Sequence, residues 1–337
     1  MRKVIHLIPF HGIGGVEQAA ATMSNLEACR FSFDVVAIFP APVLANRWII
    51  GDPVFFFKSF IRLRRSMLDV LIVSLWRACL VGILLKLLRP RMRLVLFLHL
   101  PSNVHLLDRL LTLISAHLAS SVWADSHNTL ARRLQGCSAK NGHVISFVTK
   151  RLKPISVKPV RPSFVFWGRI HVQKDLSRAL RLFHAVKLLR RDAQFSVIGP
   201  DGGDLARIRT IVVELGLVDS VQFLGPMNFS QIRQVAQSAS FYLQTSEVEG
   251  MAMSVVEAMQ LGLVPIVTPV GEIANYARSG ENAVVVIDNS TALSEIILLL
   301  ADECHYQTLR SNAINYWLDK SLYKDDVLKA CRDLLGI

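Results

Sequence analysis

Short runs of apolar residues recur along the chain and alternate with stretches in which apolar residues return every three or four positions. The runs are rich in Val, Ile, Leu and Phe and are nearly continuous, which is typical of strands buried on both faces of a parallel sheet. The stretches between them have the period of helices. In the first half we predict strands at Val4–Ile8, Phe33–Phe39, Val70–Ser74, Leu94–His99, Ser121–Asp125 and His143–Phe147, with helices that include Gly15–Ala28, Leu75–Leu88 and Asn128–Leu134.

A proline-rich basic stretch, Thr149–Pro162, interrupts this rhythm. It contains three prolines and five basic residues and has no period, so we interpret it as a linker. A second series of strands and helices follows. We predict strands at Ser163–Trp167, Phe195–Gly199, Val221–Leu224, Phe241–Thr245 and Val264–Thr268, helices at Ser177–Leu189, Leu205–Leu215 and Ser230–Gln237, and a helical tail from Thr291.

The two series predict an α/β protein of two doubly wound Rossmann-like domains that face a central cleft. A length of 337 residues suits two domains. We expect the first domain at residues 1–155 and the second at 156–320. A C-terminal helix at 321–337 would pack back on the first domain.

Composition narrows the kinds of partner that the protein is expected to bind and the compartment in which it is expected to work. Hydrophobic residues make up 52% of the chain, and the formal net charge is +12, which favours anionic partners. The five cysteines are scattered and lack metal-ligand spacing, which indicates a reducing compartment. The opening residues resemble a first strand rather than a signal peptide. The apolar stretch Val70–Leu88 carries Arg77 and Lys86, which are costly at a bilayer centre, so we predict a strand and a helix there instead of a membrane span.

Two carboxylates stand eight residues apart in the segment Glu249–Met259. A predicted strand precedes them and another follows, so both should lie at the carboxyl end of a parallel strand, where open α/β sheets bind ligands. Glu257, early in a helix, could accept hydrogen bonds from a ribose, and Glu249 from a sugar. The alternatives are a helix-dipole or capping role for Glu257, and a solvated loop position for Glu249.

Two cations follow the first strand of the second domain. Arg169 and Lys174 are placed where that strand ends, and together they could clamp a pyrophosphate. A plain basic surface loop is the alternative. The loop Gly12–Glu17 could bring backbone N–H groups to an anion, but it lacks the third glycine of a dinucleotide-binding loop and could be a simple turn. His99, at a strand end, is either a ligand contact or a structural histidine.

Basic and aromatic residues gather in the first domain. Lys58, Arg62, Arg64 and Arg65 follow a run of phenylalanines, and three more arginines lie between positions 89 and 93. Such a surface suits an anionic membrane interface. A solvated basic face is the simpler alternative. A nucleic-acid binder is disfavoured because no such motif is recognisable.

As an ordered series, these motifs resemble the family 4 retaining glycosyltransferases, whose fold is GT-B. The resemblance covers nearly all of the second domain and is thinner in the first. Its residues are Gly14–Glu17, His99, Gly168-Arg169 with Lys174, Val197–Gly203, Val221–Gly225, Glu249–Met259, Gly262–Gly271 and Gly280–Asn282. Departures at Phe147–Lys150 and Met251–Ser254 leave the acceptor and the sugar open.

The resemblance implies a role for each matching residue. Arg169 and Lys174 would hold the donor diphosphate, and Glu257 the ribose. Glu249 would hold the transferred sugar, which His99 would also face. The resemblance makes Glu249, Arg169, Lys174 and His99 the catalytic set. The implied donor-binding residues are Gly14, Gly15, Arg169, Lys174, Gly250, Met251, Ala252, Met253 and Glu257.

The implied reaction moves a sugar, with retention, from a UDP- or GDP-linked donor to a glycan or lipid-linked acceptor. We expect no metal and no other cofactor, since no Asp-x-Asp motif occurs. Cell-surface polysaccharide or lipopolysaccharide biosynthesis, at the cytoplasmic face of the cell membrane, is the expected setting. A nucleotide-sugar epimerase of the same fold and a non-catalytic sugar-nucleotide-binding subunit remain alternatives.

Overall fold

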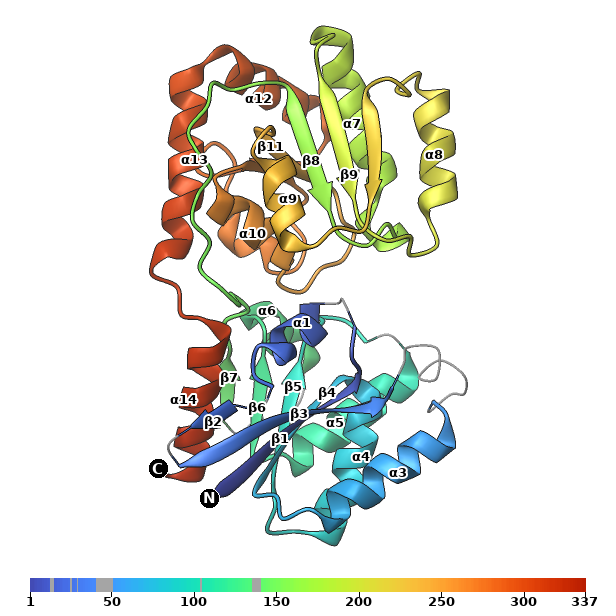
Figure 1. Ribbon diagram of the computed structural model, residues 1–337, viewed down its shortest axis with the longest axis vertical. Coiled ribbons are helices and arrows are strands. Elements are labelled where there is room, and N and C mark those ends of the chain that lie inside the picture. Colours follow the sequence, from blue (N-terminus) through green and yellow to red (C-terminus); the bar gives the residue numbers. More distant parts are fainter. Residues whose placement is uncertain (13–14, 25, 29, 41–50, 104, 135–140) are drawn as a thin grey trace. The chain divides into compact units, whose positions relative to one another are not determined.

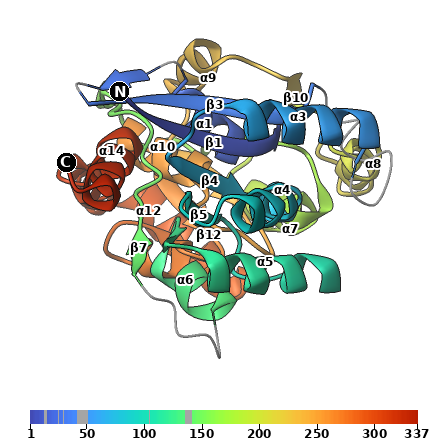
Figure 2. The same cartoon turned by 90° about the horizontal axis from the view of Figure 1, so that it is seen from below.

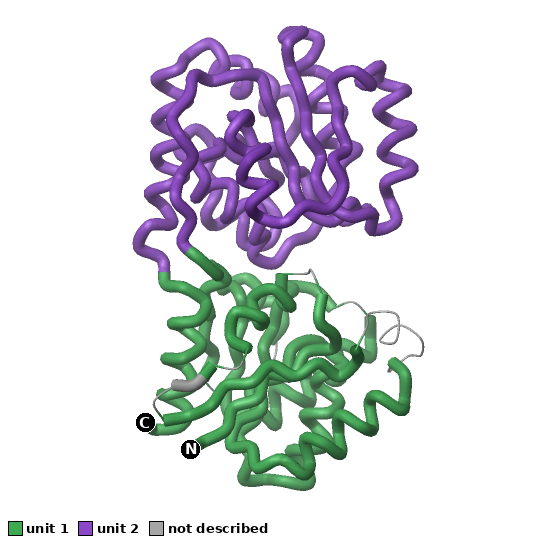
Figure 3. The backbone as a smooth tube through the Cα atoms, viewed as in Figure 1, with its two compact units in different colours: residues 1–150, 321–337 green, residues 151–320 purple. Residues whose placement is uncertain are grey.

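The computed structural model describes residues 1–12, 15–24, 26–28, 30–40, 51–103, 105–134 and 141–337. The chain divides into two compact units (Figure 3). Unit 1 consists of residues 1–150 and 321–337, and unit 2 of residues 151–320. The linker stretch contains no helix or strand.

Unit 1 is built on a seven-stranded sheet with the order β2-β3-β1-β4-β5-β6-β7. Its strands are parallel except for β2, which runs antiparallel to β3. The central strands are almost completely buried, as their continuous apolar runs predict. The strands are β1 (Arg2–Phe10), β2 (Leu26–Ala28), β3 (Phe31–Phe39), β4 (Val70–Ser74), β5 (Arg93–Leu98), β6 (Ser121–Ala124) and β7 (Gly142–Val144).

Helices cover both faces of this sheet. The chain passes from β1 to β3 in one direction and from β4 through β5 to β6 in the other, and right-handed crossovers then place the connecting helices on opposite faces. Figure 2 shows α3, α4 and α5 on one face and α14 on the other. The helices are α1 (Gly15–Ala21), α3 (Pro53–Arg65), α4 (Leu75–Leu88), α5 (Leu106–Leu118), α6 (His127–Arg133) and α14 (Tyr323–Leu335).

Unit 2 is built on a six-stranded sheet with the order β10-β9-β8-β11-β12-β13, and every pair in it is parallel (Figure 1). The chain leaves β8 toward β10 and returns to β11 on the other side of β8. The loops after β8 and β11 therefore form the topological switch point, the usual ligand site of such sheets. The strands are β8 (Ser163–Trp167), β9 (Gln194–Ile198), β10 (Val221–Gly225), β11 (Phe241–Gln244), β12 (Val264–Val267) and β13 (Val284–Val285).

The helices of unit 2 connect these strands and form its C-terminal part. A short 3-10 helix, η1 (Val172–Lys174), follows β8 and leads into α7. The α-helices are α7 (Leu176–Leu189), α8 (Leu205–Glu214), α9 (Phe229–Ala236), α10 (Met253–Leu261), α11 (Ile273–Tyr276), α12 (Asn289–Ala301) and α13 (Glu303–Leu318). The predicted architecture of two doubly wound α/β domains is thus confirmed.

One predicted helix is wrong in its second half. The expected helix Gly15–Ala28 ends at Ala21, and Leu26–Ala28 forms the edge strand β2. The Thr22 hydroxyl donates to the carbonyl oxygen of Ala19 at 2.6 Å, and a turn follows it. Thr and Ser side chains compete in this way for helical backbone groups. The three residues then pair with the buried strand β3, which the helical periodicity could not indicate.

The unit boundaries lie close to the expected ones. The first boundary falls after Lys150 instead of near 155, because residues at the start of the linker bind within unit 2. Arg151 Nη1 donates to the Trp317 carbonyl oxygen, and the Ile155 N–H donates to Leu261. In unit 1, the Tyr323 N–H of the C-terminal segment donates to the carbonyl oxygen of Val148 at 2.8 Å.

Candidate functional site

The loops after β8 and β11 are tied together by hydrogen bonds that involve their backbones. The N–H of Glu247 donates to the carbonyl oxygen of Gln173 at 3.0 Å. Gln173 Nε2 donates to Val248 O at 2.6 Å, and the Thr245 hydroxyl to Asp175 O at 2.7 Å. β8 and β11 are neighbours in the sheet, so both loops leave from the same edge. Side chains from one loop are therefore held against those of the other.

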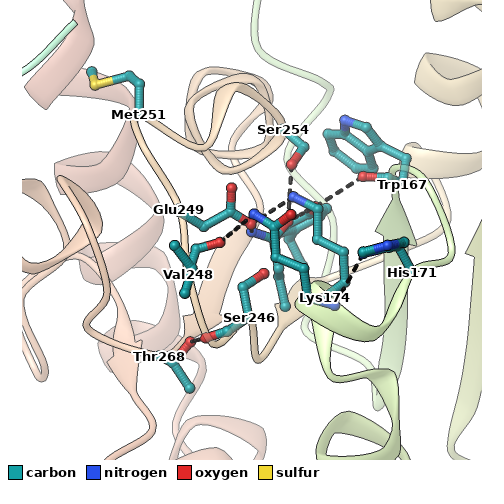
Figure 4. Close-up of polar contacts among 12 residues, drawn as sticks. Trp167, His171, Lys174, Ser246, Val248, Glu249, Met251, Ser254 and Thr268 are labelled. Atoms are coloured by element: carbon teal, nitrogen blue, oxygen red, sulfur yellow. Dashed lines mark hydrogen bonds and ion pairs between the residues drawn. The ribbon is translucent and has the colours of Figure 1, made fainter. Parts of the chain in front are cut away.

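An ion pair connects the two loops. Lys174 Nζ, at the end of η1, lies 2.5 Å from Oε1 of Glu249 (Figure 4). The side chains are only 17% and 8% exposed, so water screens this pair less than a surface pair. The sequence placed both residues at the strand ends, and the structure brings them into direct contact.

Gln244 is a buried residue that holds Glu249 from the other side. Its Nε2 donates to Oε1 of Glu249 at 3.0 Å. Its Oε1 lies 2.7 Å from the Tyr242 hydroxyl and 2.9 Å from the Ser254 hydroxyl. The amide therefore has partners at both ends, which fixes its orientation. Gln244 was not predicted from the sequence, although it is a polar residue at the end of an apolar strand.

Glu257 makes a different contact. The indole N–H of Trp167, the last residue of β8, donates to Oε2 of Glu257 at 3.0 Å. Trp167 is 4% exposed, and Glu257 lies in the second turn of α10 at intermediate exposure. The carboxylate is thus aimed toward the carboxyl end of β8 instead of serving as the N-cap of its helix. The role of Trp167 was not predicted from the sequence either.

The turn before α10 leaves backbone donors open. Ala252 has the left-handed φ of 54° and caps α10 without a side-chain hydrogen bond. In the described part of the chain, the N–H groups of residues 250–252 make no hydrogen bond. Gly271 lies so close that a Cβ would be 2.1 Å from the carbonyl oxygen of Glu249. Only glycine fits there, and the contact holds the loop in place.

Arg169 is exposed and, among the described residues, has no ion-pair partner. Its stem lies against Gly202, where a Cβ would be 2.6 Å from Cγ of Arg169. The turn that carries it is equally tight, because a Cβ on Gly199 would be 1.8 Å from the carbonyl oxygen of Gly168. The guanidinium is therefore mounted on a rigid turn and remains available to an anion.

In unit 1, His99 directly follows β5 and is 6% exposed. Its Nε2 lies 2.8 Å from the Ser74 hydroxyl, and Nε2 of His6 lies 2.7 Å from the same oxygen. Burial, reinforced by His6, holds the pKa of His99 well below its usual value. The His99 ring also contacts Phe97 at 4.4 Å between centroids. This is the environment of a structural histidine, and contact with a donor sugar stays a prediction.

Only part of the glycine loop Gly12–Glu17 lies within the described residues. Gly14 lies outside the described residues, and Gly15 is the exposed first residue of α1. Ser126 caps α6 by accepting a hydrogen bond from the N–H of Thr129 at 3.0 Å. Within the described ranges, no group of three or more His, Cys, Asp or Glu could hold a metal, and no helix is long and apolar enough to cross a membrane.

The second half of the chain matches a known protein family. Residues 149–316 match the family described as Glycosyl transferases group 1. A GDP-mannose:cellobiosyl-diphosphopolyprenol alpha-mannosyltransferase of Xanthomonas oryzae pv. oryzae is 32% identical over 143 residues, 41% of this chain and 37% of that protein. The phosphatidylinositol N-acetylglucosaminyltransferase GPI3 subunit of Saccharomyces cerevisiae is 27% identical over 162 residues, 48% of this chain and 34% of that protein. The matched segment thus spans little more than a third of these relatives.

Solved structures share the whole fold. The Anabaena protein Alr3699/HepE, in complex with UDP-glucose, matches over 100% of both chains with a TM-score of 0.80 and 18% identity. Sucrose-phosphate synthase from Thermosynechococcus elongatus also matches over 100% of both chains, with a TM-score of 0.79 and 15% identity. At these identities the likeness concerns the fold alone.

Proposed function

We propose that the chain, whose residues 149–316 match the family described as Glycosyl transferases group 1, is a retaining glycosyltransferase that uses a UDP- or GDP-linked sugar. The observation that carries this proposal is the cluster at the switch point of unit 2, where Lys174, Glu249 and Gln244 are in contact. It combines a cation for a diphosphate with a fixed carboxylate for hydroxyl groups. The solved Anabaena protein of the same fold was crystallised with UDP-glucose, which supports a nucleotide sugar as the donor.

The diphosphate is the part of the donor that gains charge when the glycosidic bond breaks. Arg169, on its rigid turn, and Lys174 would bind its oxygens, and the open N–H groups of residues 250–252 add further donors. Groups that are already positioned stabilise developing charge with little reorganisation. A diphosphate at Lys174 would compete with Glu249 for the ammonium, and Glu249, still held by Gln244, would then accept hydrogen bonds from the sugar.

Retention fits attack from the face that the diphosphate leaves. The bond between the anomeric carbon and the phosphate oxygen breaks, and the acceptor oxygen bonds to the same face of that carbon. The acceptor's proton passes to an oxygen of the leaving phosphate, so no separate protein base is required. Glu249 would orient the sugar. Its Oε1 accepts hydrogen bonds from Lys174 and Gln244, which hold the carboxylate in one position. Glu257, oriented by Trp167, would bind the ribose.

We propose that the acceptor is a glycan or lipid-linked compound at an anionic membrane, at the cytoplasmic face and in cell-surface polysaccharide or lipopolysaccharide synthesis. The names of two relatives include a diphosphopolyprenol and phosphatidylinositol, which supports a lipid. In unit 1, Val54, Phe57 and Ile61 are exposed on α3, at the spacing of one helical face, and Lys58 and Arg62 lie beside them.

A binding and turnover experiment tests the proposal. Thermal unfolding would be followed with UDP, GDP and their sugars, and a ligand well above its dissociation constant should raise the melting temperature. Each donor that binds would then be incubated alone and with lipid-linked acceptors. Lys174→Ala and Arg169→Ala should lower transfer by about a hundredfold or more while the fold survives.

Arg191→Ala is the matched control, because it removes an exposed arginine of unit 2 at the opposite edge of the sheet, just before β9. It should leave transfer unchanged. Isomerisation of the donor without acceptor would instead identify an epimerase. Binding without any turnover would identify a non-catalytic subunit, and near-normal transfer by both loop variants would refute the site.

A further inference from the structure

A second group of basic residues lies in unit 1, at the end of the sheet where its parallel strands begin. Arg2 opens β1, Asp69 directly precedes β4, and Arg93 opens β5. These three strands are neighbours and parallel. These residues therefore lie at the opposite end of the strands from Ser74 and Leu98, where β4 and β5 end.

These residues line a cavity of about 570 Å³. Leu68 and the turn Arg89–Met92, which connects α4 to β5, complete the wall. Small-molecule sites have volumes of roughly 300–1,000 Å³, so the size is adequate for a ligand. Four lining residues are arginines and one is an aspartate, which gives a formal net charge of +3. The cavity therefore selects for an anion.

The single carboxylate leaves most of this charge uncompensated. Asp69 accepts a hydrogen bond from the N–H of Lys3 at 2.8 Å and lies 3.7 Å from Nη1 of Arg2. The guanidinium of Arg89 donates to the carbonyl oxygens of Ser66 and Arg64 near the end of α3, and it forms no ion pair with a carboxylate in the described part of the chain. Arg91 is exposed, and it forms no ion pair within the described residues.

Arg93 supplies a donor that lacks a protein acceptor. Its Nη1 is buried and has no hydrogen-bond partner among the described protein atoms. A buried donor without an acceptor is unfavourable, and the planar guanidinium suits the oxygens of a phosphate. The adjoining turn is held in place, because Lys86 Nζ donates to the carbonyl oxygens of Pro90 and Met92 at 2.9 and 2.6 Å.

We propose that this cavity binds a phosphate-bearing anion, with Arg91 and Arg93 as its main contacts. A phosphate monoester or a diphosphate has the required chemistry. Either a soluble phosphate compound or the headgroup of an anionic lipid could supply that group. The proposal does not rest on transferase activity, since its residues lie in unit 1, at the opposite end of the strands from Ser74 and His99.

Two probes distinguish the sources. Titration calorimetry with inorganic pyrophosphate, at low and at physiological salt, tests a soluble ligand. Co-sedimentation with phosphatidylcholine vesicles, with and without phosphatidic acid, tests a lipid headgroup. Both measurements use the full chain with Arg169→Ala and Lys174→Ala as background, which weakens any binding of diphosphate by unit 2. Arg91→Gln is an exposed substitution and should fold normally, and Arg93→Gln removes the buried donor.

We expect Arg91→Gln and Arg93→Gln each to weaken binding of the effective probe by about tenfold. Arg132→Gln removes the same charge from an exposed position on α6 and should change binding less than about twofold. Loss of pyrophosphate binding identifies a soluble ligand, and loss of vesicle binding alone identifies a lipid headgroup. The proposal is refuted if neither probe binds, or if Arg132→Gln weakens binding as much as Arg91→Gln does.

Discussion

Lys174 Nζ and Glu249 Oε1 lie 2.5 Å apart and join the loops that follow two neighbouring strands of unit 2. The pair is largely shielded from water. The same atom of Glu249 also accepts a hydrogen bond from Gln244. The ion pair therefore holds both loops, and it keeps the ammonium in place for an anionic ligand.

Glu249→Gln should destabilise unit 2 through this pair. The substitution keeps the shape and removes the charge, which leaves the ammonium of Lys174 with a weaker partner in a site of low exposure. We expect the free energy of unfolding to fall by about 1–3 kcal/mol, measured by urea unfolding. Glu281→Gln is the control because its pair with Arg278 is exposed, and it should cost less than about 0.5 kcal/mol. Equal losses would mean that the buried pair contributes no more than the exposed one.

Gln244→Leu should act on turnover more than on donor binding, if Glu249 orients the transferred sugar as proposed. The side chain would no longer hold Glu249, the hydroxyl of Ser254 would lose its acceptor, and the hydroxyl of Tyr242 would keep only the carbonyl oxygen of Trp167. We expect kcat to fall about 10- to 100-fold with a small change in the KM for the donor. Ser254→Ala removes only one of these contacts and should have a much smaller effect. An unchanged kcat in Gln244→Leu would contradict a positioning role.

Glu257→Gln should change the KM for the donor more than it changes kcat. Ribose hydroxyls do not react, so losing their carboxylate acceptor should raise the KM for the donor about tenfold while kcat changes less. Trp167→Phe keeps an aromatic side chain but removes the N–H that orients Glu257, and we expect a smaller rise of about threefold. Glu214→Gln, at the exposed end of α8, should leave KM unchanged. If Glu257→Gln did the same, the ribose would have to be bound elsewhere.

Membrane binding should depend on the exposed face of α3. Phe57→Ser combined with Ile61→Ser removes two exposed apolar side chains and should weaken binding to anionic vesicles by about tenfold or more. Leu188→Ser combined with Val213→Ser removes comparably exposed side chains from unit 2 and serves as the control. Binding that is insensitive to the α3 variant but weakened by salt would indicate purely electrostatic attraction to the surface.

The sequence predicted the elements best where the pattern of burial is simple. Val70–Ser74 and Leu75–Leu88 are a strand and a helix with the expected bounds: the first is a fully buried apolar run, and the second is an apolar helix that carries Arg77 and Lys86. The edge strand Leu26–Ala28 was missed because its three residues are defined by pairing with β3 and not by a local period.

The candidate site was predicted as positions and not as contacts. The order of the motifs along the chain placed Lys174, Glu249 and Glu257 near strand ends. This placement requires only the order of strands and helices. The partners of these residues depend on which strands are neighbours in the sheet. Gln244 and Trp167 belong to adjacent strands, β11 and β8, that are separated by more than seventy residues of chain. A single sequence carries no direct indication of such a pairing.

The two buried histidines of unit 1 should make the chain sensitive to mild acid. Nε2 of His6 and Nε2 of His99 share the Ser74 hydroxyl, which can donate to one ring and accept from the other, and the ring that accepts must be neutral. Burial lowers the pKa of His6 to about 3 and holds the pKa of His99 well below its usual value. In the unfolded chain both should titrate near about 6.5. Below that pH the unfolded chain binds more protons than the folded chain does.

Stability should therefore be complete above about pH 6.5 and should fall as the pH drops toward about 3, by up to about 1.4 kcal/mol per pH unit for each histidine. Urea unfolding between about pH 7.5 and 5 measures this slope before most carboxylates titrate. His99→Gln removes one titrating group and should make the slope shallower, whatever its effect on stability at neutral pH. His143→Gln, at an exposed position, should leave the slope unchanged. A slope in His99→Gln equal to that of the unaltered chain would show that His99 takes up a proton in the folded state as readily as in the unfolded one.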